Sequence, residues 1–437
     1  MTDTADAANL MEPARPALGR RQAVQNLVAH GSALLIVFVA TLLVARLAGP
    51  AVLGAYAMLR VLPWLTGVVV SSGLPMASAY FLAAGTRDDP RLRPTLALLA
   101  ALGSGIGALL WLAATPLLQR FFVVVPLWLL ALASITVITR LLTVWGKACC
   151  QGAADIRGAN LVIVMEELMF LPWYAVALAA GLRGVTAVIA GLVCGGTCAA
   201  LTALGRLLRT GFAHGWGRPS VKIARRVVHY GARGQLGDLL FLVNMRLDFV
   251  ILGALAGPAV LGMYAVASKF AELIRLPAVA VRYVLYPRFA RQGPRSASRD
   301  VRRLLPRAAA MTALLTPVLG GASVIALPLL FGPAFQAAVL PACILLIGLA
   351  AWGAAAVSTA FLCGIGRPGV NSWAMGIGVA VTVSLDVLLI PRHGAVGAAV
   401  ASSAAYLVTT VLLSAFTVRL AARALRTPVD DPATDSS

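Results

Sequence analysis

Long apolar segments alternate with short polar connections that contain arginine along almost the whole chain. Each segment has roughly the 20 residues that a helix needs to cross the hydrocarbon core of a bilayer. Hydrophobic residues run continuously within a segment rather than at every second position, so the pattern predicts helices and not a β-barrel. Divided at clusters of glycine, proline and arginine, the chain has twelve predicted spans. They are residues 24–48, 52–84, 94–119, 122–146, 158–181, 184–208, 228–255, 259–288, 303–331, 335–364, 370–391 and 394–424.

The composition supports an all-α integral membrane protein. Of the 437 residues, 60% are apolar and 12% are charged, and the mean hydropathy is +0.89. A soluble domain contains about twice that share of charged residues. This composition excludes a soluble enzyme and a soluble nucleic-acid-binding protein.

The net charge of +20 is distributed unevenly between the two sides of the predicted spans. Most Lys and Arg residues fall in one alternating set of connections. The opposite set contains only Arg46, Arg120, Arg183 and Arg392. Because cytoplasmic loops are enriched in basic residues, this asymmetry places both termini in the cytoplasm. It also explains the positive charge without a nucleic-acid partner.

An internal repeat divides the chain into two halves. LAGPAVLGAYA (47–57) recurs as LAGPAVLGMYA (255–265), and both copies follow an odd-numbered span. Two halves of six spans have the same orientation in the membrane, as in transporters built from parallel repeats. The expected parts are a disordered N-terminus (1–23), an N-lobe (24–210), a linker (211–227), a C-lobe (228–424) and a disordered tail (425–437).

The repeated motif is expected to form a helical hairpin. In each copy, the first glycine can end a helix in the left-handed conformation and the following proline suits the first turn of the next helix. The second glycine allows close helix packing. The tyrosine is expected in the aromatic belt at the membrane surface. These residues are Gly49, Pro50, Gly54 and Tyr56, and Gly257, Pro258, Gly262 and Tyr264.

Short motifs along the chain carry a resemblance to a known family. They are ARLAGPAVLGAYA (45–57), SSGLP (71–75), LDFVILGALAGPAVLGMYAVASK (247–269), LYPRFAR (285–291), GIGRPG (364–369) and LLIPRHGAVGAAVASSAAY (388–406). In this order on twelve spans, the chain resembles the polysaccharide (O-antigen-type) flippases. These are the Wzx-like branch of the multidrug/oligosaccharidyl-lipid/polysaccharide exporter (MOP) superfamily.

The resemblance implies a fold and a function. The fold would be a V-shaped bundle of two six-helix lobes, as in MATE transporters, working by alternating access. The substrate would be an undecaprenyl-diphosphate-linked oligosaccharide, flipped across the bacterial cytoplasmic membrane for O-antigen, lipopolysaccharide or other surface polysaccharide. Membrane lipids, a polysaccharide polymerase and glycosyltransferases would be its partners, and no cofactor is implied. The sequence departs from the family at Asp386, where Asn is more frequent.

Charged residues inside predicted spans suggest a cavity, because such residues usually face a cavity or a partner. Glu272, Arg275 and Arg282 fall within about 80° of one helix face. Guanidinium groups pair well with phosphate oxygens, so a positively charged cavity suits a diphosphate. The predicted diphosphate-binding residues are Arg60, Arg246, Lys269, Arg275 and Arg282, with Asp248 and Glu272 as ion-pair partners. The alternative is that these charges are salt-bridged packing.

Other charged residues have different expected roles. Arg140, Arg233 and also Arg282 lie near the inner ends of spans and are expected to snorkel to headgroups. Glu166 and the adjacent Glu167 point about 100° apart, so at most one is expected to face a cavity. Glu166 and Asp386 are candidates for ion coupling. The spacing of Cys and His residues predicts no metal site.

Two other functions fit a multi-pass membrane protein less well than a flippase does. A cation-coupled multidrug antiporter of the same superfamily would need an acidic cavity, whereas the predicted cavity is net positive. A membrane glycosyltransferase or polymerase would need a sizeable outer loop, whereas the outward connections are short and no DxD motif occurs. The sequence therefore favours a transporter over an enzyme.

Overall fold

The computed structural model describes residues 20–83, 89–292 and 294–426, and helices form nearly all of this part. The first half contains α2 (Arg20–Ser71), α3 (Leu74–Ala83), α4 (Leu92–Leu118), α5 (Leu127–Leu132), α6 (Ser134–Gly152), α7 (Ile156–Leu168), α8 (Phe170–Ala179) and α9 (Gly184–Arg209). The second half contains α10 (Val221–Ala271), η1 (Glu272–Ile274), α11 (Arg275–Arg291), α12 (Pro294–Phe331), η2 (Pro333–Ala338), α13 (Val339–Leu349), α14 (Trp352–Gly364) and α15 (Pro368–Arg426).

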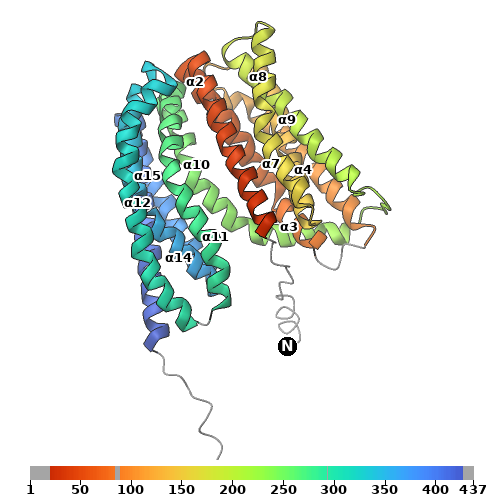
Figure 1. The fold of residues 1–437 in the computed structure, drawn as a ribbon. Coiled ribbons are helices and arrows are strands. Elements are labelled where there is room, and N and C mark those ends of the chain that lie inside the picture. The colour runs from red at the N-terminus through yellow and green to blue at the C-terminus, as the bar shows by residue number, and fades with distance from the viewer. Residues whose placement is uncertain (1–19, 84–88, 293, 427–437) are drawn as a thin grey trace, which may run out of the picture.

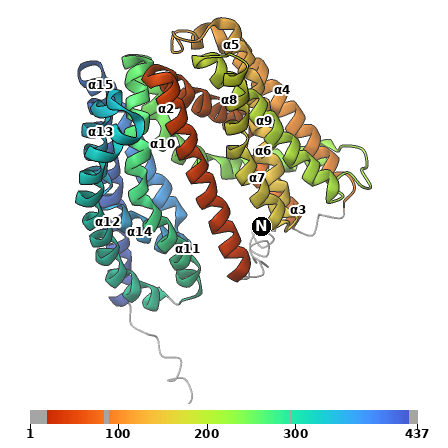
Figure 2. The same ribbon diagram turned by 45° about the horizontal axis from the view of Figure 1, so that its top comes forward.

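The two halves form two bundles that lean together at one end and diverge toward the other (Figures 1 and 2). The kinked tops of α2 and α10 lie side by side at the closed end of this V. The start of α2 and the end of α15 both lie at the opposite end. This arrangement confirms the predicted V-shaped helical bundle.

Three long helices are kinked at a glycine with a positive φ. These residues are Gly49 (φ 79°), Gly257 (φ 83°) and Gly394 (φ 52°). Only glycine adopts these angles without strain, so the helix breaks there and turns back. The first two breaks confirm the hairpins predicted from the repeated motif.

The number of membrane crossings depends on how these kinked helices are divided. Within the described residues, eight helices are long and apolar enough to cross a membrane, or nine when the bent pair Pro333–Leu349 and Trp352–Gly364 counts as one span. Divided at the three kink glycines, the helices agree with the predicted segments to within several residues. The total of twelve crossings stays a prediction.

Several predicted spans are interrupted in the structure. They are 52–84, 122–146, 158–181, 259–288 and 335–364. Ser72 and Gly73, for example, have φ values of 45° and 75° and end α2 before α3 begins. Hydropathy averaged over a span is insensitive to a break of one or two residues, so the pattern could not reveal these interruptions.

The predicted linker 211–227 is partly helical and lies against the first half. The amide of Gly217 donates to the Pro90 carbonyl at 2.8 Å, and the amide of Ser220 donates to Thr95 Oγ1 at 2.9 Å. Farther along α10, the ring of Tyr230 stacks on Tyr80 with centroids 4.4 Å apart. The first turns of α10 are therefore anchored to the first half before the helix continues into the second.

Candidate functional site

The two copies of the repeated motif meet at the closed end of the V. A Cβ atom added to Gly54 would lie 1.8 Å from the carbonyl oxygen of Pro258. In the other direction, a Cβ atom added to Gly262 would lie 2.0 Å from the carbonyl oxygen of Pro50. The contact is reciprocal and involves backbone on both sides, so only glycine fits either position.

Arg46 makes a second contact between the halves at this end. Its Nε donates to the carbonyl of Leu330 at 2.5 Å, and its Nη2 donates to the carbonyl of Leu329. Both carbonyls belong to the last turn of α12, where a helix presents unpaired acceptors and favours a positive charge. This contact closes the end of the molecule where the twin motifs meet.

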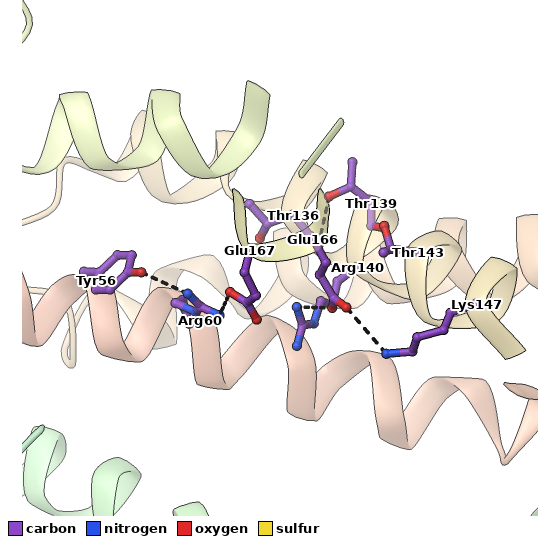
Figure 3. A network of polar contacts seen from close by, with 9 residues as sticks. All are labelled: Tyr56, Arg60, Thr136, Thr139, Arg140, Thr143, Lys147, Glu166 and Glu167. Atoms are coloured by element: carbon purple, nitrogen blue, oxygen red, sulfur yellow. Dashed lines mark hydrogen bonds and ion pairs between the residues drawn. The ribbon is translucent and has the colours of Figure 1, made fainter. Parts of the chain in front are cut away.

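A network of charges lies within the first half (Figure 3). Arg60 on α2 donates to Glu167 of α7 at 2.5 Å and to the hydroxyl of Tyr56 at 2.9 Å. Tyr56 is buried, and Tyr264 in the second copy of the motif is buried as well. The prediction that these tyrosines lie in an interfacial belt is therefore wrong, because both side chains are buried and their hydroxyl groups form hydrogen bonds inside the protein.

Glu166 occupies the centre of the same network. It pairs with Arg140 of α6 and lies 3.5 Å from Nζ of Lys147, which is two helix turns beyond Arg140. Figure 3 shows both cations approaching this carboxylate from α6. The expected snorkelling of Arg140 to headgroups is wrong, since its guanidinium turns inward to a carboxylate. Lys147 also lies inside α6 rather than in a connection.

Hydroxyl groups line a cavity beside this network. Arg60, Arg140 and Glu166 contribute its charged wall. The other polar side chains come from one face of α6, at positions three or four apart: Thr136, Thr139 and Thr143. The sequence contained a signal for this face, because Thr136, Arg140, Thr143 and Lys147 recur at helical spacing.

A second charged cluster lies in the C-terminal half around Glu272. This carboxylate accepts from Arg246 at 3.1 Å and from Lys269 at 2.9 Å. Arg275, one helix turn farther along, lies with its guanidinium carbon 4.4 Å from the centre of the Trp352 ring. The structure thus brings together four of the residues selected from the sequence.

The two clusters are close enough to interact across the boundary between the halves. Arg60 and Lys269 repel each other electrostatically, although they belong to different halves. Together the clusters contain more cations than carboxylates. The cations are Arg60, Arg140, Lys147, Arg246, Lys269 and Arg275, and the carboxylates are Glu166, Glu167 and Glu272. The two clusters taken together are therefore net positive.

Asp248 attracts Arg246 electrostatically, but its hydrogen bonds go to other groups. Its carboxylate is buried and accepts from the hydroxyl of Tyr264 at 2.6 Å and from Ser402 Oγ at 3.3 Å. Asp386 is also buried, near enough for the two carboxylates to repel each other. Neither oxygen of Asp386 has a hydrogen-bond partner among the described residues.

Two other predicted residues do not join the clusters. Arg282 is exposed in the middle of α11, which agrees with snorkelling rather than with a place beside Glu272. The side chain of Arg233 lies outside the described residues. Arg282 lies seven residues beyond Arg275 in the continuous helix α11, so it shares that face but is roughly 10 Å farther along the helix axis.

The fold is that of a membrane transporter. A structure described as the lipid II flippase MurJ in an inward closed conformation has a TM-score of 0.76 at 13% identity, covering 92% of this chain and 89% of that chain. An inward-facing multidrug resistance MATE family transporter of the MOP superfamily has a TM-score of 0.65 at 14% identity, with 91% and 95% covered. The Vibrio cholerae MATE transporter VcmN in the bent form has a TM-score of 0.57 at 14% identity, with 93% and 97% covered.

The family is shown by sequence. Residues 43–340 match the family described as polysaccharide biosynthesis protein, and the chain belongs to that family. No curated protein matches the chain by sequence. The family resemblance inferred from the short motifs is confirmed. The chain is a multi-pass membrane protein whose fold is similar to those of the MurJ flippase and the MATE transporters of the MOP superfamily.

Proposed function

We propose that this transporter flips an undecaprenyl-diphosphate-linked oligosaccharide across the bacterial cytoplasmic membrane for surface polysaccharide biosynthesis. The observation that carries the proposal is the net positive charge of the two clusters, which interact across the boundary between the halves through Arg60 and Lys269. The cations of the clusters come from both halves, so a bound anion would contact both. Guanidinium and ammonium groups are the side chains that proteins use to bind phosphate.

Arg60, Arg246, Lys269 and Arg275 are the proposed diphosphate ligands. In the absence of substrate, Glu167 and Glu272 hold three of these cations in place. A diphosphate could share or replace these carboxylates without leaving a buried cation unpaired. Arg282 is proposed as an outer contact for the substrate, because it is exposed two helix turns beyond Arg275.

Alternating access would move this region from one side of the membrane to the other. The twin motifs and Arg46 close one end of the boundary between the halves. With both termini cytoplasmic, as the arginine distribution predicts, the closed end faces outward. Separation of the twin motifs would then open the cavity to the outer leaflet.

A coupling ion would act away from the diphosphate ligands. Asp248 and Asp386 are two adjacent buried carboxylates, and two such charges are not stable together without a proton or a cation. They favour Asp386 over Glu166 as the coupling residue, because Glu166 already has two cationic partners. Energy input through this pair fits a flippase that moves substrate in one direction.

The second candidate is a cation-coupled multidrug antiporter of the same superfamily. The same buried acidic pair would suit it. However, a cationic drug would have to enter a region where every described carboxylate of the two clusters is already paired with an arginine or a lysine. The excess of positive charge favours an anionic substrate.

The test is genetic and uses matched variants. Deletion of the gene should cause lipid-linked oligosaccharide to accumulate on the inner leaflet and surface polysaccharide to be lost, and the wild type should restore both. Arg246→Ala and Arg275→Ala should each lower flipping about 10- to 100-fold, the effect of losing a charge-assisted contact. Arg392→Ala removes an exposed arginine outside both clusters and should restore fully.

Each other outcome has a defined meaning. Full rescue by Arg246→Ala and Arg275→Ala would reject the cationic region as the binding site while leaving the flippase assignment intact. Normal surface polysaccharide after deletion, together with new sensitivity to cationic dyes, would reject the flippase assignment in favour of the antiporter.

A further inference from the structure

Helix α12 has exposed arginines on the face that would contact lipid. It is the least buried of the candidate spans, with 17% of its apolar window buried, and it lies at the outer edge of the second half (Figure 1). Toward its C-terminal end it exposes large apolar side chains: Leu314 (72% exposed), Val318, Ile325 and Leu329. Such side chains on a spanning helix contact lipid tails.

The arginines of the first turns continue the same face. At 100° per residue, Arg299, Arg303 and Arg307 fall with the exposed apolar residues inside one arc of roughly 120°. All three are exposed. The opposite face is buried against the second half through Ala297, Val301 and Ala308. The lipid-facing side of α12 is therefore apolar along its C-terminal part and cationic along its first turns.

The distances along the axis match the layers of a bilayer. With a rise of 1.5 Å per residue, the exposed residues Leu314 to Leu329 cover roughly 22 Å, somewhat less than the hydrocarbon core of about 30 Å. Arg307 lies roughly 10 Å beyond Leu314, and Arg299 roughly 22 Å beyond it. This range places the three guanidinium groups at the border of the core and among the headgroups.

The one carboxylate near these arginines does not cancel their positive charge. Asp300 is the one carboxylate in the segment 294–307. It is engaged by Arg288 of α11 at 2.5 Å and by Nε2 of Gln292 at 3.0 Å. This pairing holds the ends of α11 and α12 together and leaves the face with an excess of arginine.

The corresponding place in the first half differs. Arg93 near the start of α4 donates to the carbonyl of Gly211 at 3.0 Å, so its guanidinium is tied to the protein. No run of exposed arginines follows it along α4 within the described residues. A general excess of positive charge in cytoplasmic loops would affect both halves, whereas the row of exposed arginines on α12 lies in the second half.

We propose that Arg299, Arg303 and Arg307, the arginine stripe, bind the phosphate groups of anionic phospholipids in the adjacent leaflet. The stripe faces lipid rather than the cavity, so its ligand is the resident bilayer and not the transported substrate. Guanidinium groups bind phosphate oxygens through paired hydrogen bonds. The bound lipids fix the depth and tilt of α12, the outermost helix of the second half.

The test compares the purified full chain with two triple variants. Arg299→Gln, Arg303→Gln and Arg307→Gln together remove the stripe. Arg209→Gln, Arg218→Gln and Lys222→Gln together remove three exposed cations from the end of α9, the connection after it and the first turn of α10, and are the matched control. Each protein is mixed with phosphatidylcholine and phosphatidylglycerol in detergent, and the retained lipids are quantified by mass spectrometry at low and high salt.

The wild type should retain phosphatidylglycerol preferentially at low salt, because salt screens exposed charges. The stripe variant should lose roughly fivefold in affinity per arginine, on the order of 100-fold in total. The control variant and a charge-preserving variant with lysine at all three stripe positions should keep most of the preference. Each protein must first elute as a monodisperse peak.

Two results would overturn the proposal. Equal losses in the stripe and control variants would show that net charge alone attracts the lipid. Unchanged lipid preference in the stripe variant, with loss of binding to a polyglutamate peptide, would assign the stripe to an acidic protein partner instead.

Discussion

Asp155 illustrates how one residue joins two helices of the first half. Its carboxylate caps the N-terminus of α7 by accepting from the amide of Gly158 at 3.0 Å. It also accepts from Arg206 of α9 through Nε at 2.7 Å and Nη2 at 2.9 Å. These two bonds from Arg206 hold the pKa of Asp155 below its usual value.

The stabilisation by Asp155 should therefore depend on pH. A lowered pKa in the folded state means that the ionised carboxylate stabilises the protein above the ordinary aspartate pKa, and that this contribution is lost as the pH falls through the folded value. Asp155→Ala should lose about 1–2 kcal/mol at pH 7, mainly through the cap and the ion pair. The difference in melting temperature from the wild type should shrink below about pH 4.

Asp155→Asn is the control for this prediction, because asparagine keeps the cap but loses the charge. It should lie between the wild type and Asp155→Ala at pH 7. A difference between wild type and Asp155→Ala that stays constant from pH 7 to pH 3 would contradict the argument.

Asp386 should be dispensable for folding but required for coupling. A buried carboxylate without a hydrogen-bond partner among the described residues does not stabilise the fold. The free energy of unfolding of Asp386→Asn should therefore lie within about 1 kcal/mol of the wild-type value. In vesicles, the same variant should lose the dependence of flipping on a proton or sodium gradient. Serine at Thr143, in the other half, is the control and should keep that dependence. Unchanged gradient dependence in Asp386→Asn would exclude Asp386 from coupling.

At the scale of elements, the hairpins of α2 and α10 depend on two glycines each. The first glycine of each motif makes the turn through a positive φ, and the second packs closely against the proline carbonyl of the other motif. The turns could be predicted from the sequence, because glycine followed by proline between two apolar segments is a local signal. The contact between the copies could not, because it joins residues about 200 positions apart.

Gly54→Ala should disfavour the closed end of the V. The added Cβ would lie 1.8 Å from the carbonyl of Pro258, and neither backbone can move without separating α2 from α10. We expect a loss of about 1–3 kcal/mol for the closed arrangement, as for overpacking in a core. Thiol labelling of a cysteine placed at Val52 should become roughly 5- to 100-fold faster. Gly262→Ala should have the same effect.

Gly105→Ala is the matched control. Gly105 lies inside α4, and a Cβ atom there would meet nothing within 4 Å. Alanine at this position should leave the labelling rate unchanged. Equal labelling in Gly54→Ala and Gly105→Ala would show that the twin motifs do not close the boundary between the halves.

At the scale of the whole molecule, one arginine helps to hold the two halves closed. Arg46 of the first half binds two carbonyls at the end of α12 in the second half. Arg46→Ala should remove about 1–3 kcal/mol from the closed arrangement and raise the outward-open fraction. Hydrogen exchange should increase at the C-terminal turn of α12 and around the twin motifs. Arg120→Ala, which removes an exposed arginine predicted on the same side of the membrane, should leave hydrogen exchange at these places unchanged.

The membrane location, the helices, the two halves and the hairpin turns could be predicted from the sequence. These features depend on local composition, on helical periodicity and on a repeat of eleven residues, all of which can be read along the chain. The sequence also identified most of the cations between the halves, because charge is rare within spans and therefore conspicuous.

The pairing of these groups depends on tertiary packing. Arg140 pairs with Glu166, Asp248 accepts a hydrogen bond from Tyr264, and the two motifs contact each other through bare backbone. Each outcome depends on the rotation of a helix about its axis and on the distance to a helix far away in the sequence. A single short break such as η1 changes that rotation, so hydropathy and spacing cannot determine which side chains meet.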